Sequence, residues 1–119
     1  MIEIGSRRRA QPAPPHVVAA SLITPDSDPA RPWLHLLRDE QRPRVVEADP
    51  PRLVVWSSLW PEQPEALLRF DLAPGGSGGG TALRWTLLVD TEPDASRLGH
   101  YRHRLNQLIN ADLRHTYGQ

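Results

Sequence analysis

Apolar and polar residues alternate strictly in two stretches of the second half of the chain. In residues 66–72 the apolar positions Leu68, Phe70 and Leu72 fall on one side. Residues 81–90 repeat the spacing, with one side formed by Leu83, Trp85, Leu87 and Val89. A period of two is typical of strands that bury one side and solvate the other. Since that pattern belongs to antiparallel sheets, we expect these two strands to lie in one.

The last part of the chain has a helical period instead. Thr91 and Asp94 have the spacing of a capping box, with Pro93 tolerated in the first turn. At about 100° per residue, apolar and polar side chains separate onto two sides, which predicts a long amphipathic helix. The apolar side contains Leu98, Tyr101, Leu105, Leu108, Ile109 and Leu113. The polar side contains Arg97, His100, His103, Arg104, Gln107, Asn110 and Arg114.

Shorter elements precede these. Ile2 and Ile4 alternate before a basic run at residues 7–9, as in an edge strand with a charged end. Prolines then open or close short apolar runs. The pattern predicts, in chain order, a strand at 2–10, a short helix at 13–22, a second short helix at 31–37, and strands at 44–48 and 52–60. The fold class is therefore α+β.

Length and charge limit the possible functions. A chain of 119 residues is most simply one domain, spanning 1–119. Fourteen cations, all Arg, balance fourteen carboxylates, so no overall field attracts nucleic acid, and none is expected as a partner. No apolar run approaches the roughly 20 residues that span a bilayer, so stable membrane insertion is not expected. With no Cys and no leader-like N-terminus, we expect a cytoplasmic protein.

Motifs for catalysis or metal binding are absent from the sequence. The glycine-rich stretch 74–80 lacks the Lys-Ser/Thr of a phosphate loop and precedes a strand, so it is interpreted as a flexible hairpin connection. His100 and His103 share a helical side but have no acidic neighbour, and no metal or other cofactor is expected. No nucleophile elbow surrounds Ser57 or Ser58. The catalytic residues are therefore unknown, and any catalysis would be general acid–base chemistry.

Polar residues interrupt the apolar side of the terminal helix. Arg102, Asp112 and Thr116 project into it or onto its margin. Asp112 is the most unusual, because a carboxylate near a helix C-terminus opposes the dipole and an unpaired buried charge is costly. Two interpretations stay open: a structural ion pair or exposed helix end, and a polar anchor in a ligand pocket.

The order of elements resembles the helix-grip fold of the START and polyketide cyclase/dehydrase superfamily (SRPBCC), of which the chain would be a short member. The likeness rests on the terminal helix and on three stretches: Ala13-Pro14-Pro15-His16-Val17-Val18, Pro51–Ser57 and Gly80–Trp85. The resemblance implies a curved antiparallel sheet wrapped on the C-terminal helix, with two short helices after the first strand. It also implies a cavity between sheet and helix for lipids, polyketides or aromatic molecules.

These observations predict the binding or transport of a small hydrophobic ligand in that cavity by a monomer or homodimer. One alternative is a cyclase or dehydratase using Asp112, Arg102 or His16 as its acid–base group. Another is a protein-interaction module with a filled interior. The expected ligand contacts are Trp56, Phe70, Trp85, Tyr101, Arg102, Leu105, Ile109 and Asp112.

Overall fold

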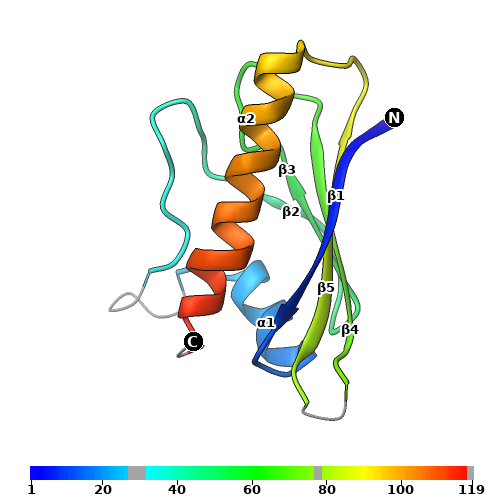
Figure 1. Ribbon diagram of the computed structural model, residues 1–119, viewed down its shortest axis with the longest axis vertical. Helices are drawn as coiled ribbons and strands as arrows, with labels where there is room; N and C mark the ends of the chain where they lie inside the picture. The colour runs from blue at the N-terminus through cyan, green and yellow to red at the C-terminus, as the bar shows by residue number, and fades with distance from the viewer. Residues whose placement is uncertain (27–31, 77–78, 118–119) are drawn as a thin grey trace.

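The computed structural model describes residues 1–26, 32–76 and 79–117. Within them, one curved antiparallel sheet is crossed by a long C-terminal helix (Figure 1). The elements in chain order are β1 (Ile2–Gln11), α1 (Pro15–Ile23), β2 (Val45–Asp49), β3 (Leu53–Ser57), β4 (Leu67–Pro74), β5 (Thr81–Val89), α2 (Ala95–Asn106) and the π-helical η1 (Gln107–Leu113). The expected α+β helix-grip architecture is confirmed.

The sheet has five strands in the order β1-β5-β4-β3-β2. Every neighbouring pair is antiparallel, and β1 and β2 form the two edges. The predicted alternation is confirmed, because Phe70 lies opposite Trp85 and Leu68 opposite Leu87, all on the buried side. Between Glu3 and Gly5 the register of β1 shifts, which marks a bulge at this edge.

The terminal helix lies across the inner side of the sheet, as its apolar side requires (Figure 1). Leu105, Leu108 and Ile109 are fully buried, and Tyr101 and Leu113 are buried with them. Because the sheet and the helix each have only one apolar side, packing the two together removes both from water.

The helix begins later than the capping-box spacing predicts. Asp94, not Thr91, is the N-cap: its backbone is extended and its carboxylate accepts a hydrogen bond from the Arg97 amide at 2.9 Å. An Asp side chain reaches the amide three residues on and satisfies one of the free donors of the first turn. Pro93 therefore lies before the helix and not in its first turn.

The predicted second short helix is wrong. Pro32 to Leu37 run as an irregular segment, while Arg31 and the preceding four residues lie outside the described part of the chain. A short apolar run does not by itself distinguish a helix from an extended segment, so tertiary contacts decide. Here the neighbouring Trp33 and Leu34 are both buried, and the carbonyl of His35 is bonded to a side chain of the terminal helix.

Aromatic rings fill the space between sheet and helix. Trp56 stacks on Trp33 at 6.0 Å and meets Phe70 edge-on at 4.8 Å. Trp60 stacks on Tyr101 with 4.0 Å between ring centroids. Each of the five rings is at most 3% exposed. Offset and edge-on contacts of this kind add to the area they bury, so this part of the interior is a packed core.

The connection from β4 to β5 runs through the glycine-rich stretch. Ser77 and Gly78, at the centre of the predicted flexible hairpin, lie outside the described residues. Gly80 has a φ of 81°, and a Cβ there would lie 2.5 Å from the carbonyl oxygen of Gln11. Only glycine fits this positive φ and this close contact with the β1 backbone, which explains why it stands immediately before β5.

Candidate functional site

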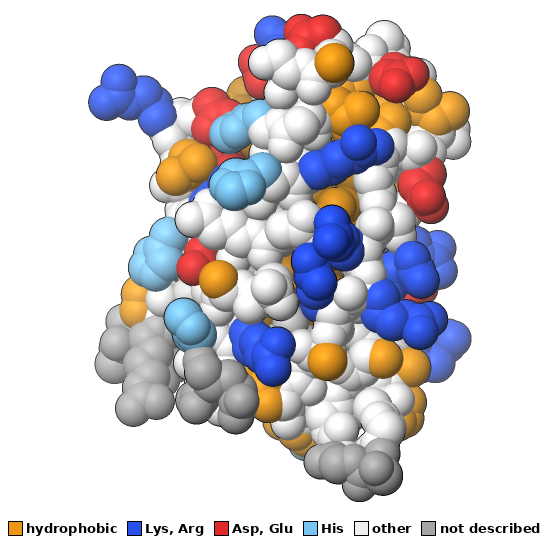
Figure 2. All heavy atoms as spheres, viewed as in Figure 1, with side chains coloured by type: hydrophobic (Ala, Val, Ile, Leu, Met, Phe, Trp, Pro, Cys, Tyr) orange, Lys and Arg blue, Asp and Glu red, His pale blue; other side chains and the backbone are white. Residues whose placement is uncertain are grey.

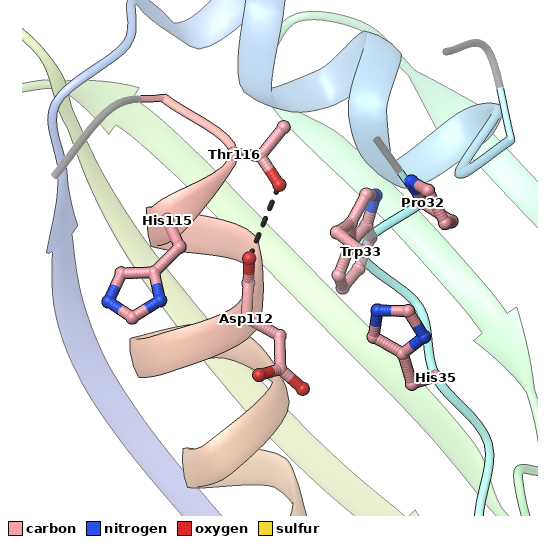
Figure 3. A pocket seen from close by; sticks show the side chains of 6 residues that line it. All are labelled: Pro32, Trp33, His35, Asp112, His115 and Thr116. Carbon is pink, nitrogen blue, oxygen red and sulfur yellow. Dashed lines mark hydrogen bonds between the residues drawn. The ribbon is translucent and has the colours of Figure 1, made fainter. Parts of the chain in front are cut away.

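A cleft of about 390 Å³ lies where the end of the terminal helix meets the irregular segment after α1 (Figure 3). We call it the C-terminal cleft. Pro32, Trp33 and His35 form one wall, and Asp112, His115 and Thr116 form the other. In Figure 3 the Asp112 carboxylate and the His35 ring project toward the same space, whereas His115 turns to the other side of the helix.

The helical wall of this cleft is π-helical. Residues Gln107–Leu113 form wider turns than an α-helix, and such turns are frequent at functional sites. Two side chains bond carbonyls of this stretch. Gln11 of β1 donates from Nε2 to the Ile109 oxygen at 2.9 Å, and Thr116 donates from Oγ1 to the Asp112 oxygen at 3.2 Å. These bonds hold Asp112 in its position on the cleft.

The opposite wall is fixed by a buried ion pair. The Arg104 guanidinium donates to both carboxylate oxygens of Glu40, at 2.7 and 3.0 Å, and also to the carbonyl of His35. The two side chains are 3% and 0% exposed. Glu40 in turn accepts from the Leu37 amide at 2.8 Å. This network ties the irregular segment to the helix and positions His35 and Trp33 at the cleft.

The C-terminal cleft is lined by the edge of a buried indole and by a few polar groups. Trp33 is 3% exposed, and its indole Nε1 has no hydrogen-bond partner among the described residues. The half-buried Asp112 forms no ion pair with another described residue. The structural ion pair is therefore not formed among the described residues, whereas the partial exposure of Asp112 agrees with an exposed helix end. The polar anchor in a ligand pocket stays a prediction. The carboxylate and the His35 ring can accept or donate protons and hydrogen bonds at this position.

The expected ligand contacts do not converge on one cavity. The structure places six of them in the packed core: Trp56, Phe70, Trp85, Tyr101, Leu105 and Ile109. Asp112 lines the C-terminal cleft. Arg102 lines a second hollow, beside Trp85. Their role as ligand contacts stays a prediction.

This second hollow, the seam cleft, lies between β1 and α2. Its volume is about 240 Å³, and its lining residues are Gly5, Ser6, Arg7, Trp85, Arg102 and Asn106. The Arg102 guanidinium donates to the Ile4 carbonyl from Nε at 2.9 Å and from Nη2 at 2.6 Å. These bonds hold its charged head against the edge strand and over the hollow.

The three acid–base candidates lie apart. Asp112 is in the C-terminal cleft, Arg102 is in the seam cleft, and His16 lies in a groove on the outer side of α1. They cannot form one catalytic group. Among residues 1–26, 32–76 and 79–117, no group of three His, Cys, Asp or Glu side chains could hold a metal ion. No helix in the same ranges is long and apolar enough to cross a membrane.

The two tyrosines of the C-terminal part of the chain resist ionisation. Burial, together with a 3.0 Å hydrogen bond to the Glu62 carboxylate, raises the pKa of Tyr101 to about 12. Burial also raises the pKa of Tyr117, whose hydroxyl donates to Ser21 at 2.9 Å. Both hydroxyls therefore serve as neutral donors that fix the helix to its surroundings.

The sequence analysis missed several of the residues that build the cleft walls. The sequence pattern assigns Arg104 to the polar side of the helix, yet this residue is only 3% exposed. It is buried because it pairs with Glu40, which is 64 residues away in the chain, so no local pattern could indicate the contact. Trp33 and His35 are placed on a helix that does not form. The local signals were Asp112 and Thr116, two polar residues at the apolar side of the helix.

No protein-family model and no curated protein matches the chain. Solved structures do. CalU16 from Micromonospora echinospora matches with a TM-score of 0.67 and 18% identity over 92% of this chain and 70% of its own. The Aha1 dimer from Colwellia psychrerythraea matches with a TM-score of 0.69 and 18% identity, over 93% of this chain and 92% of its own. A protein from Rhodobacter sphaeroides matches with a TM-score of 0.63 and 22% identity, over 93% of this chain and 87% of its own. At these identities the likeness establishes the fold alone.

Proposed function

We propose that this chain binds a small apolar or aromatic molecule that carries a polar group, and that it does so in the C-terminal cleft. The observation that carries the proposal is the cleft itself: about 390 Å³ of space bounded by an indole ring on one side and a carboxylate on the other. Ligand pockets typically measure roughly 300–1,000 Å³ and combine apolar walls with a few polar groups that orient the ligand.

The cleft provides both kinds of contact. Trp33 offers an apolar wall backed by Trp56, on which it stacks. Asp112, His35 and Thr116 offer polar contacts at the margin. We propose that Asp112 touches the ligand, and that Trp56 and Ile109 support the site from behind. The remaining expected contacts, apart from those at the seam cleft, contribute by shaping the sheet and helix.

The binding experiment uses N-phenyl-1-naphthylamine, an uncharged apolar probe whose fluorescence rises when it leaves water. We expect saturable binding to the wild-type chain. Thr116→Phe places a ring in the cleft and should weaken binding at least tenfold. The matched control is Asn110→Phe, which adds the same ring to an exposed position of the same helix and should change affinity less than twofold. Undiminished binding by Thr116→Phe contradicts the proposal.

A second candidate is a protein-interaction module, and the packed interior favours it. The five aromatic rings are buried in the core, and all five residues of β2 at the sheet edge are exposed. Native mass spectrometry of freshly purified protein separates the two candidates. A co-purifying small molecule supports ligand binding. A bare chain that also fails to bind the probe supports the interaction module.

A further inference from the structure

The seam cleft between β1 and α2 depends on the absence of a side chain at Gly5. Gly5 sits at the bulge of β1, and a Cβ at this position would lie 3.2 Å from the Trp85 ring and 3.3 Å from the Arg102 side chain. Both distances are tighter than ordinary contacts. The glycine thus leaves space for the side chains of Trp85 and Arg102. These two residues line the hollow together with Arg7, and the three come from β5, α2 and β1.

Trp85, which lines the seam cleft, carries a buried hydrogen-bond donor without an acceptor in the described chain. Trp85 is 1% exposed, and its Nε1 has no partner among the described residues. An indole N–H can only donate, and a buried donor without an acceptor is destabilising. Asn106 adds an amide at the same place whose oxygen is also unpartnered in the described chain.

The rim of the seam cleft is positively charged. Neither Arg7 nor Arg102 forms an ion pair with any residue that the structure describes. Five other arginines do, with partners on the same or neighbouring elements: Arg42, Arg52, Arg69, Arg97 and Arg104. Basic side chains follow the seam between the terminal helix and β1 in Figure 2. Two arginines without an ion-pair partner among the described residues therefore lie side by side at this hollow.

We propose that the seam cleft binds the carboxylate or phosphate group of a small ligand, with Arg102 and Arg7 as donors and the Trp85 ring beside the bound group. Arginine is suited to this task because its fork of donors matches both anions and keeps its charge when partly buried. No carboxylate side chain lines the hollow to compete for these donors. A volume of about 240 Å³ suits a small anion. This site is separate from the C-terminal cleft and does not depend on it.

The test uses NMR spectroscopy of the ¹⁵N-labelled chain. The tryptophan indole N–H signals are followed during titration with three probes at constant ionic strength. Sodium benzoate carries a carboxylate, benzyl alcohol carries the same ring without the charge, and inorganic phosphate carries the other anion. We expect benzoate or phosphate to shift the Trp85 signal saturably. The signals of Trp33 and Trp60, which are also buried and unpartnered, should move less. A response to only one of the two anions assigns that anion as the preferred group.

Two outcomes overturn the proposal at this stage. One is a Trp85 signal that neither anion moves. The other is a response to benzyl alcohol as large as that to benzoate, because the hollow would then recognise the ring and not the charge.

A pair of variants tests the role of the charge. Arg7 is exposed and lies opposite Trp85 on the inner side of β1, so Arg7→Gln should fold normally. It should weaken the binding of the effective anion about tenfold, since it removes a charge-assisted hydrogen bond. Arg8→Gln is the matched control. It removes the same charge from the next position, which lies opposite Arg84 on the outer side. Equal weakening by both variants would show general charge attraction and would refute a defined site.

Discussion

Arg104 shows how a single side chain decides the position of a whole segment. Its guanidinium bonds two oxygens of Glu40, the carbonyl of His35 and the Gln107 side chain, the last at 3.1 Å. Removing two charges from water is costly, and only this complete set of partners offsets the cost. The pair therefore holds the irregular segment in one register against the helix.

We expect Arg104→Met to destabilise the fold by about 3–5 kcal/mol, because the buried Glu40 carboxylate loses its counter-charge. The double variant Arg104→Met with Glu40→Leu should recover most of this loss. The free energy of unfolding in urea measures both. Arg97→Met is the control: Arg97 pairs with Glu62 at the surface, where such pairs contribute about 0–1 kcal/mol. If Arg104→Met lowered the unfolding free energy no more than Arg97→Met, the Arg104–Glu40 pair would not hold the segment in place.

Tyr101 makes stability sensitive to alkaline pH. Its pKa is raised from 10.0 to about 12 in the folded chain, so between these values the unfolded chain releases a proton that the folded chain keeps. The free energy of unfolding should therefore fall as pH rises from about 10 to about 12, by on the order of 2 kcal/mol. In Tyr101→Phe the fall should be smaller, leaving the part due to Tyr117. Unfolding curves with identical pH dependence in both chains would refute this assignment.

At the scale of elements, a hydrogen bond between β1 and the π-helical η1 explains why Gln11 is buried. Gln11 is 3% exposed and occupies an inner position of the edge strand where an apolar residue would be usual. Its amide bonds the Ile109 carbonyl, which lies in the wide turns of η1. A polar residue is needed there because a buried carbonyl without a donor is costly.

Gln11→Leu keeps a similar side-chain volume and removes this donor. We expect a loss of about 1–3 kcal/mol in unfolding free energy. Hydrogen exchange should show where it acts: the amides of residues 107–113 should exchange faster relative to those of residues 95–106. Unchanged protection in η1 would mean that Gln11 does not stabilise the wide turns.

The elements that could be predicted are those with a local signal. The strand at 81–90 and the terminal helix follow from periods of two and 3.6, which need only the order of residues. The segment at 32–37 could not be predicted, because its conformation depends on Arg104 and Trp56, both distant in sequence. The π-helical turns depend in the same way on a bond from β1.

At the scale of the whole molecule, the packing of helix on sheet determines where a ligand can bind. Sequence patterns predicted this packing and, through the resemblance, a cavity inside it. The arrangement is confirmed, but side-chain volumes decide whether an interior is hollow, and periodicity carries no information about them. Large rings such as Trp56, Trp60 and Phe70 fill the space, which leaves the C-terminal and seam clefts at the rims as candidate sites.

The most direct test of this account is the free energy of unfolding of Leu105→Ala. Leu105 is fully buried between helix and sheet, so we predict a loss of about 3–5 kcal/mol, as for a leucine in a tightly packed core. Leu37→Ala, at a side chain that is 45% exposed, should cost less than about 1 kcal/mol. A Leu105→Ala loss as small as that of Leu37→Ala would contradict the account, because the helix would then stand clear of the sheet or face an open cavity.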